Sequence, residues 1–184
     1  DIDYLEYLIS LEKLPVDFVM GYKVLLDKDG LTKNLQPPTY EYPYTQKPSQ
    51  EEFDLVTRIF FFEAFKEARA LVRGDLGHVK IRDFITKDKL LTMIEWREKA
   101  LHGWNYDTNC GAKKMKSWID PKVWEDLFGT FAHFDTDDSA RKLIATLDLF
   151  RALARETSGA LGYKYLEDVD SNISSWIAKT LCGF

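Results

Sequence analysis

Two aspartates at the start of the chain, Asp1 and Asp3, are spaced as a pair of metal ligands would be. Segment 1–11 (DIDYLEYLISL) alternates apolar and polar residues over part of its length and is rich in Ile, Leu and Tyr, which predicts a strand. Alternate residues of a strand share a face, and two adjacent carboxylates can hold Mg²⁺ for phosphoryl chemistry. The alternative is a solvated edge strand near a terminus.

Arg97 and His102 form an R-x4-H pattern, which is also found in the HEPN class of helical endoribonucleases, where Arg and His act on the scissile phosphate. On a regular helix, five positions leave the two side chains about 140° apart, so they would need a distortion or a partner chain to converge. The alternative for His102 is structural, because a positive imidazole in a last helical turn suits the negative end of the helix dipole.

Segment 90–104 (LLTMIEWREKALHGW) predicts a helix with a buried face that ends at Gly103. Glu95 and Trp96 lie in its middle and would suit a cationic ligand, because carboxylates and aromatic faces attract cations. Alternatively, Trp96 belongs to the core and Glu95 forms a surface pair with Lys99 one turn later. No GxGxxG, Walker, HExxH or GxSxG motif occurs in the sequence, and its three histidines are scattered.

The elements that must position these residues fall into three parts. Residues 1–30 combine the predicted strand with a segment that stops at Gly30, and Asp27-Lys28-Asp29-Gly30 is expected to be an exposed turn. Residues 31–49 hold four of the six prolines and three tyrosines, so they are predicted to be an extended connector. Residues 50–184 are expected to form a bundle of five to seven helices.

The predicted helices have clear starts and stops. Ser49-Gln-Glu-Glu52 is a capping-box pattern that opens a central helix, which contains Glu63 and ends near Gly74. Asp120-Pro121 and the acidic run 135–138 open two more helices, and a stripe with spacings of three and four follows the second. The first of these two covers 121–132. Further helices are predicted over 75–85, 87–102 and 169–181, with a short one in MKSWI (115–119). The fold class is therefore mainly α, with a short strand from a neighbouring α/β domain.

Composition limits the partners. The chain has 184 residues, 45% of them hydrophobic, a net charge of −5 and no dominant Lys/Arg cluster, so we expect a folded protein that does not bind nucleic acid. No apolar run approaches a membrane span, and the two cysteines have no CxxC or zinc spacing, which favours a reduced, cytoplasmic protein. We expect a monomer or weak homodimer. The chain does not begin with Met, and we expect further residues upstream.

Several stretches, taken in order, resemble the C-terminal two-thirds of the aminoglycoside 6-adenylyltransferases (streptomycin adenylyltransferases). The matching stretches are LISLEKL (8–14), VLLDKDG (24–30), KPSQEEF (47–53), LVRGDL (71–76), LLTMIEW (90–96), the region from Gly111 to Lys113 with MKSWI, and LGYKY (161–165). This resemblance implies an N-terminal nucleotidyltransferase domain, a helical bundle, and transfer of AMP from ATP to a hydroxyl of a streptomycin-like antibiotic with Mg²⁺.

The resemblance also implies roles for individual residues. Asp3, with Asp1 or Glu6 as alternatives, would supply a third metal-binding carboxylate, and the first pair would lie upstream. Lys28 would approach the phosphates of ATP. The cationic aminoglycoside would meet Glu95 and Trp96 first. Glu52 and Glu63 from the central helix are further candidates for substrate contact. A chain without the upstream phosphate loop would be inactive by itself. The resemblance supplies no counterpart for Arg97 and His102.

Overall fold

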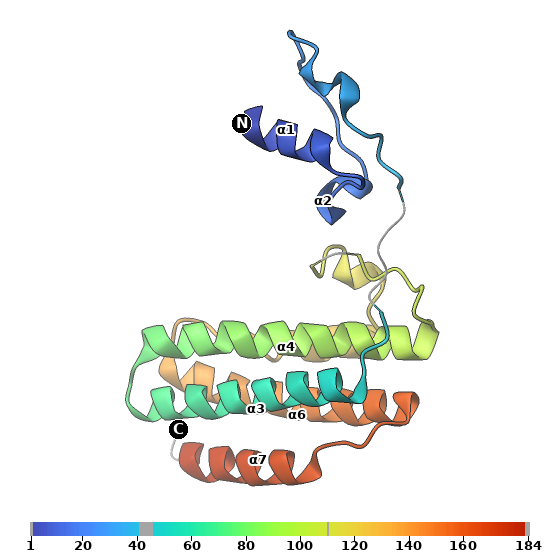
Figure 1. Ribbon diagram of the computed structural model, residues 1–184. Coiled ribbons are helices and arrows are strands. Elements are labelled where there is room, and N and C mark those ends of the chain that lie inside the picture. The colour runs from blue at the N-terminus through green and yellow to red at the C-terminus, as the bar shows by residue number, and fades with distance from the viewer. Residues whose placement is uncertain (1, 41–45, 110, 183–184) are drawn as a thin grey trace. The chain divides into compact units, whose positions relative to one another are not determined.

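The computed structural model describes residues 2–40, 46–109 and 111–182, which divide into two compact units, residues 1–45 and 46–184. The described residues form seven α-helices and no strand (Figure 1), so the predicted mainly α class is confirmed. None of the described helices combines the length and the apolar character that crossing a bilayer requires. The boundary between the units falls inside the segment expected to be a connector.

The first unit contains α1 (Ile2–Ser10), α2 (Val16–Val19) and a short 3₁₀ helix, η1 (Leu31–Asn34). The strand predicted over 1–11 is wrong, because this segment is the helix α1. Its apolar residues follow a helical period as well as an alternating one: Leu5, Leu8 and Ile9 share one face, and Leu8 is buried. Asp3 in the first turn suits the positive end of the helix dipole.

The turn at 27–30 is held by Asp27, whose carboxylate accepts hydrogen bonds from the Leu31 N–H at 2.9 Å, the Thr32 N–H at 3.0 Å and the Thr32 hydroxyl at 2.6 Å. The hydrogen bonds from Thr32 favour the charged carboxylate and lower the pKa of Asp27. Gly30 has φ +68°, which a residue without Cβ adopts without strain. Lys28 is exposed beside this turn.

The second unit is built around α3 (Gln50–Val72), and the predicted capping box at its start is confirmed. The Ser49 N–H donates to Glu52 Oε2 at 2.7 Å, and the Glu52 N–H donates to Ser49 Oγ at 3.2 Å. Phe60 and Phe61 of α3 are fully buried, and both contact Phe150 of α6 (Thr136–Leu161), the first stacked at 3.6 Å between ring centroids. These three rings form the centre of the core.

Helix α4 (Leu76–His102) runs unbroken for 27 residues, whereas two helices were predicted over 75–85 and 87–102. Residues 78–102 contain no glycine or proline that would break the helix, and the Thr86 hydroxyl donates to the Arg82 carbonyl at 2.9 Å inside it. Four helices, α3, α4, α6 (Thr136–Leu161) and α7 (Glu167–Leu181), lie side by side in Figure 1. The 3₁₀ helix η2 (Met115–Ser117) and α5 (Pro121–Phe128) lie between α4 and α6 in the chain.

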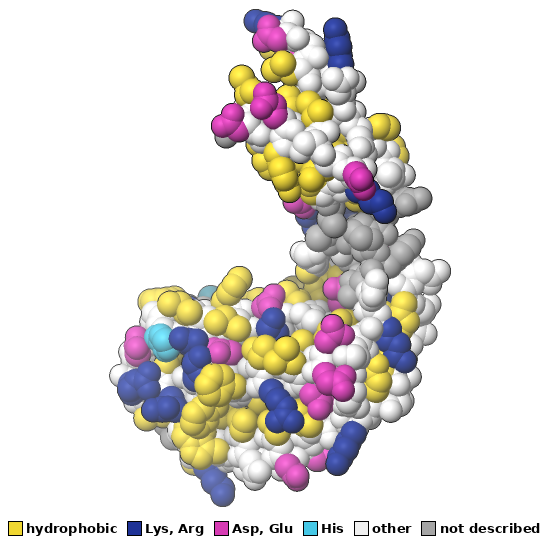
Figure 2. Space-filling view, in the orientation of Figure 1, with side chains coloured by type: hydrophobic (Ala, Val, Ile, Leu, Met, Phe, Trp, Pro, Cys, Tyr) yellow, Lys and Arg dark blue, Asp and Glu magenta, His cyan; other side chains and the backbone are white. Residues whose placement is uncertain are grey.

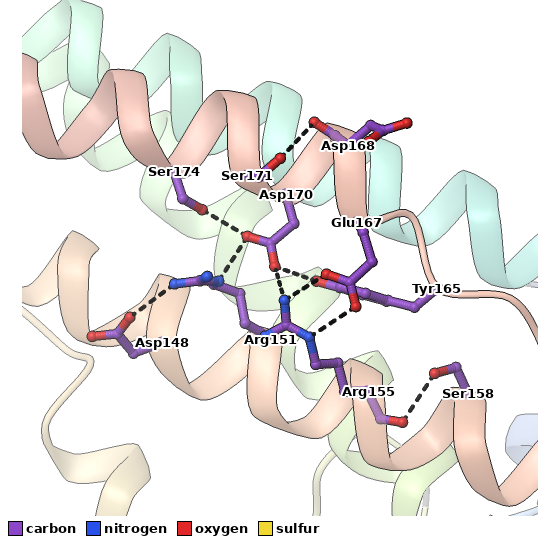
Figure 3. Close-up of polar contacts among 10 residues, drawn as sticks. All are labelled: Asp148, Arg151, Arg155, Ser158, Tyr165, Glu167, Asp168, Asp170, Ser171 and Ser174. Atoms are coloured by element: carbon purple, nitrogen blue, oxygen red, sulfur yellow. Dashed lines mark hydrogen bonds and ion pairs between the residues drawn. The ribbon is translucent and has the colours of Figure 1, made fainter.

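A buried carboxylate joins α6 to α7 (Figure 3). Asp170 is 0% exposed and forms ion pairs with Arg151 Nε at 2.6 Å and with Arg155 Nη2 at 2.8 Å. The Tyr165 and Ser174 hydroxyls donate to the same carboxylate at 3.1 and 2.9 Å. Burial and the neighbouring carboxylate raise the pKa of Tyr165, so this hydroxyl keeps its proton and acts as a donor.

Candidate functional site

A cleft of about 270 Å³ lies between the second half of α4 and the segment 103–118 that follows it. Helix α4 forms one wall with residues that recur every three or four positions and therefore share one face. The other wall comes from the segment after the helix. The described residues that line the cleft are Asp88, Leu91, Thr92, Glu95, Thr108, Gly111, Ala112 and Trp118.

Three hydrogen bonds fix the cleft wall: one joins the segment 103–118 to α4, and two join parts of the segment to each other. The buried Lys99 donates its ammonium hydrogen to the Tyr106 carbonyl at 2.8 Å, and the Tyr106 hydroxyl donates to the Trp118 carbonyl at 2.9 Å. The Trp118 indole N–H donates to the Lys113 carbonyl at 3.0 Å. The bond from Lys99 positions the segment relative to α4, and the other two fix the path of the segment itself.

Glu95 is the central polar group of the cleft. Its Oε1 accepts a hydrogen bond from the Thr108 hydroxyl at 2.9 Å and lies 3.9 Å from the Lys99 ammonium nitrogen. The Glu95 side chain is 29% exposed, whereas the Lys99 side chain is 0% exposed. Burial lowers the pKa of Lys99, but the nearby Glu95 and Asp107 favour its charged form. Glu95 is therefore oriented by the opposite wall and still reaches solvent.

The backbone of the cleft wall is strained. Among the described residues, four non-glycine residues have positive φ, and three of them lie in this wall: Asn109 at +53°, Ala112 at +59° and Lys114 at +51°. Such conformations cost L-residues about 1 kcal/mol each. Backbone strain of this kind concentrates at functional sites. A non-glycine residue keeps a left-handed conformation only where the surrounding structure holds it there.

The charge of the cleft is negative. Asp88 and Glu95 line it seven residues apart on one face of α4, and no Lys, Arg or His belongs to its described lining. The exposed Asp88 carboxylate forms an ion pair with Lys89 at 2.8 Å. Trp118 adds an indole to the wall. Carboxylates and an aromatic ring in one concave surface favour a cationic ligand.

A larger acidic groove of about 520 Å³ lies between α5 and α6. Its carboxylates are Glu125, Asp126 and Asp148, and all three residues are exposed. Two of them are already paired, because Asp126 contacts the Lys122 ammonium and Asp148 contacts Arg151 at 3.5 Å. Glu95 of the α4 cleft is only 29% exposed and is held by Thr108, so its charge is screened less by solvent than these exposed carboxylates, and we favour the α4 cleft.

The other residues predicted to bind the substrate lie elsewhere in the bundle. Trp96 is buried and stacks on Phe53 with 6.5 Å between ring centroids, so it packs in the core. Glu52 closes the capping box of α3. Glu63 pairs with Lys66 at 2.8 Å and with Arg82 at 3.0 Å. Hydrogen bonds from these two cations outweigh desolvation and lower the pKa of Glu63. The structure therefore brings none of these three into the cleft with Glu95.

The residues predicted to serve the nucleotide and metal belong to the first unit. Asp3 lies exposed on α1 and Lys28 lies at the 27–30 turn, while Asp1 is outside the described residues. In the described part of the chain, no three His, Cys, Asp or Glu side chains gather as a metal site would need. A Mg²⁺ centre would therefore need further ligands besides Asp3.

Arg97 and His102 have structural partners. Arg97 pairs with Glu98 at 2.8 Å and with Glu156 at 2.6 Å, and these contacts outweigh desolvation and raise the pKa of Arg97. His102 lies 3.6 Å from the same buried Glu98. Both side chains therefore contact one carboxylate on α4, and no observation supports the ribonuclease alternative.

The sequence prediction missed several residues of the cleft. Asp88 had a recognisable signal, because it precedes Glu95 by seven residues, two helical turns, in a helix that carries both. No sequence signal pointed to Thr108 and Trp118, because their approach to α4 depends on the path of the segment that carries them. This path includes four residues with positive φ: Asn109, Gly111, Ala112 and Lys114.

The structure defines an all-helical bundle with an acidic cleft on one face, and comparisons with known proteins identify the family. The family model described as streptomycin adenylyltransferase matches residues 2–180. The chain therefore belongs to the streptomycin adenylyltransferase family, as its sequence predicted.

Two curated relatives carry the same name. The aminoglycoside 6-adenylyltransferase of Bacillus subtilis (strain 168) is 27% identical over 162 residues, which cover 88% of this chain and 57% of the relative. The aminoglycoside 6-adenylyltransferase of Campylobacter jejuni is 27% identical over 180 residues, which cover 93% of this chain and 62% of the relative. The matched region therefore spans about three-fifths of the length of these relatives.

A solved structure agrees at the level of the fold. The crystal structure of an aminoglycoside 6-adenyltransferase from Bacillus subtilis superposes with a TM-score of 0.69 at 24% identity, and the match covers 76% of this chain and 53% of that one. This likeness shows that the helical architecture is shared.

Proposed function

We propose that this chain is the substrate-binding part of an aminoglycoside adenylyltransferase and that the α4 cleft receives the cationic antibiotic. The acidic cleft around Glu95 is the observation that carries this proposal. Family membership and the names of the two curated relatives support the substrate class. The reaction would join the α-phosphorus of ATP to an antibiotic hydroxyl and release pyrophosphate, which would inactivate the drug and confer resistance.

The cleft residues would bind and orient the antibiotic. A guanidinium or ammonium group would donate charge-assisted hydrogen bonds to the Glu95 carboxylate, whose position the Thr108 hydroxyl fixes. Asp88, two turns earlier on α4, would receive a second cationic group, and Trp118 would offer an aromatic surface. Two anchors at different points of a rigid sugar set its orientation, and this presents one hydroxyl to the nucleotide.

The catalytic chemistry needs groups beyond those that the described residues bring together. When bound, Mg²⁺ would activate the attacking hydroxyl and neutralise phosphate charge. Asp3, with Asp1 beside it, remains our proposal for one carboxylate of that site, and Lys28 our proposal for a contact with ATP. We expect the 184-residue chain to bind the antibiotic without transferring AMP. Because ATP is the co-substrate, we propose a cytoplasmic protein, and we expect a monomer or weak homodimer.

Calorimetric titration of the chain with streptomycin tests the proposal. The Glu95→Gln variant should bind about tenfold more weakly or worse, because a charged hydrogen bond is replaced by a neutral one. The matched control is Glu125→Gln in the α5–α6 groove, which should bind like the wild type. Absence of streptomycin binding by the folded wild type would refute the proposed substrate, and loss confined to Glu125→Gln would move the site to the larger groove.

A further inference from the structure

A second concave surface in the bundle has the opposite charge. A pocket of about 220 Å³ at the α3–α4 junction is lined by Lys66, Arg69, Arg73 and His78. Figure 2 shows Lys and Arg side chains beside a histidine at the end of the bundle where α3 meets α4. The chain as a whole carries a net charge of −5, so this local excess of cations opposes the charge of the molecule.

The helical period places these side chains together. Lys66, Arg69 and Arg73 are three and four residues apart, so they follow one face of α3 over its last two turns. Gly74, with φ +67°, turns the chain directly into α4, whose first turn contains His78. The pocket therefore combines the end of one helix with the start of the next.

The neighbouring carboxylate does not neutralise the pocket. Glu63 pairs with Lys66 at 2.8 Å and with Arg82 at 3.0 Å, so one negative charge already serves two cations. Arg82 Nε also donates to His78 Nε2 at 3.0 Å. This contact uses the His78 Nε2 as the acceptor.

Two guanidinium groups remain without an acidic partner among the described residues. Arg69 stacks over Phe65, with its Cζ 5.6 Å from the ring centroid, and Arg73 is exposed at the end of α3. Stacking on an aromatic face uses the plane of the guanidinium, whereas its N–H donors lie around the edge of that plane. Both arginines can therefore donate to a ligand without first breaking an ion pair.

We propose that this pocket binds a phosphate-bearing anion through Arg69 and Arg73. The planar guanidinium offers paired N–H donors that match two oxygens of a phosphate, and two such groups one helical turn apart provide a bidentate clamp. A cationic antibiotic would be repelled here, so this site is separate from the one proposed for the substrate. The anion is either free phosphate or pyrophosphate, or the phosphate end of a nucleotide.

Titration of the 184-residue chain with sodium phosphate, pyrophosphate and ATP, in a chloride buffer of low ionic strength, tests the proposal. We expect saturable binding of at least one anion, weakened about tenfold or more in Arg69→Gln and in Arg73→Gln. Arg58→Gln is the matched control, because this exposed arginine is on the same helix about 16 Å from Arg69. Binding that is tighter for ATP than for pyrophosphate would identify a nucleotide site, and the reverse a free-anion site.

Two results would overturn the proposal. One is the absence of saturable binding of all three anions at millimolar concentration by the wild type. The other is an equal weakening in Arg58→Gln, which would show attraction to the overall charge of α3. Because the three arginines are exposed, each variant should keep the circular dichroism spectrum and melting temperature of the wild type, so a loss of binding reports on the pocket.

Discussion

The Thr108 hydroxyl donates a 2.9 Å hydrogen bond to Glu95 Oε1, and this bond connects the two walls of the acidic cleft. Thr108 is 1% exposed, so the bond forms away from bulk water. A carboxylate that is held from one side loses less conformational freedom when a ligand binds. Thr108 therefore serves to position Glu95, which we propose contacts the substrate.

Replacing Thr108 by Val should weaken this arrangement without changing the volume of the side chain much. We expect the free energy of unfolding to fall by about 1 kcal/mol, because one buried hydrogen bond to a charged group is lost. Streptomycin affinity should fall several-fold. Urea unfolding and calorimetric titration would measure the two effects.

Thr92→Val is the matched control for this experiment. Thr92 also lines the cleft, but its hydroxyl donates to the Asp88 carbonyl inside α4 at 2.9 Å, and it forms no hydrogen bond with the described residues of the opposite wall. If Thr92→Val reduced streptomycin affinity as much as Thr108→Val, the contact between the walls would have no special role in binding.

Lys114 offers a test of backbone strain in the cleft wall. Its φ of +51° and ψ of +28° are in the left-handed region, which costs an L-residue but not glycine. Lys114→Gly should therefore raise the free energy of unfolding by about 0.5 to 1 kcal/mol, partly offset by the greater freedom of the unfolded chain. Thermal or urea unfolding measures this change.

The neighbouring Lys113→Gly is the control, because Lys113 is also exposed and is not among the residues with positive φ. It should be neutral or destabilising, since glycine adds freedom to the unfolded chain without relieving strain. Equal stability of the two glycine variants would show that the left-handed conformation of Lys114 carries no cost.

The sequence predicted the starts of three helices of the bundle correctly, because capping side chains fix where a helix begins. The capping box at Ser49 and Glu52 and the aspartate caps before α5 and α6 are as expected, because each side chain satisfies nearby N–H groups whatever the rest of the fold does. The strand predicted at 1–11 failed because a short apolar segment fits both periods, and its packing partners decide between them.

The candidate site was predicted only in part. Glu95 could be selected because its type and its place in a helix are visible in the sequence, and it does line a cleft. Trp96 follows it directly, but consecutive helical residues point about 100° apart, so one faces the cleft and the other the core. Thr108 could not be predicted, since its contact with Glu95 depends on a loop 13 residues further along.

Asp170 should be the most sensitive acidic residue of α7. Asp170→Ala would leave Arg151 and Arg155 without the carboxylate they share, and would remove the acceptor for the Tyr165 hydroxyl. Removing one partner of a buried ion pair lowers the free energy of unfolding by about 3 to 5 kcal/mol. Because both arginines are partly exposed, we expect a decrease near the lower end of this range. Chemical denaturation would measure it.

Asp168→Ala is the control for this experiment. Asp168 is on the same helix two residues earlier, is exposed, and forms no ion pair among the described residues. The Asp168→Ala variant should lower the free energy of unfolding by no more than about 0.5 kcal/mol, mostly because a negative charge near the start of a helix interacts favourably with the helix dipole. A similar loss in both variants would mean that the network around Asp170 contributes little beyond the charge at the start of α7.

Glu67 should make the stability of the bundle depend on pH. It is 1% exposed between α3 and α4, and its Oε2 has no hydrogen-bond partner among the described residues. Burial, with a further contribution from Asp83, raises the pKa of Glu67 from 4.5 to about 8, although Lys87 and Lys80 oppose the shift. The folded chain therefore keeps a proton that the unfolded chain releases.

The sign of the effect follows from this difference in bound protons. Between pH 4.5 and about 8 the folded state holds more protons than the unfolded state, so the free energy of unfolding should fall as the pH rises through this interval. Each unit of pKa difference corresponds to about 1.4 kcal/mol, which sets an upper bound of a few kcal/mol for the whole interval. Glu67→Gln cannot ionise and should lose this pH dependence.

Urea unfolding at several pH values between these limits would measure the effect, with Glu51→Gln on the exposed start of α3 as the control. Relative to the wild type, Glu67→Gln should gain stability steadily as the pH rises, whereas the difference between Glu51→Gln and the wild type should change little. If the free energies of unfolding of the wild type and Glu67→Gln differed by the same amount at every pH in the interval, Glu67 would bind its proton equally in the folded and unfolded chains. The burial of Glu67 between α3 and α4, with Oε2 lacking a hydrogen-bond partner among the described residues, predicts the opposite result.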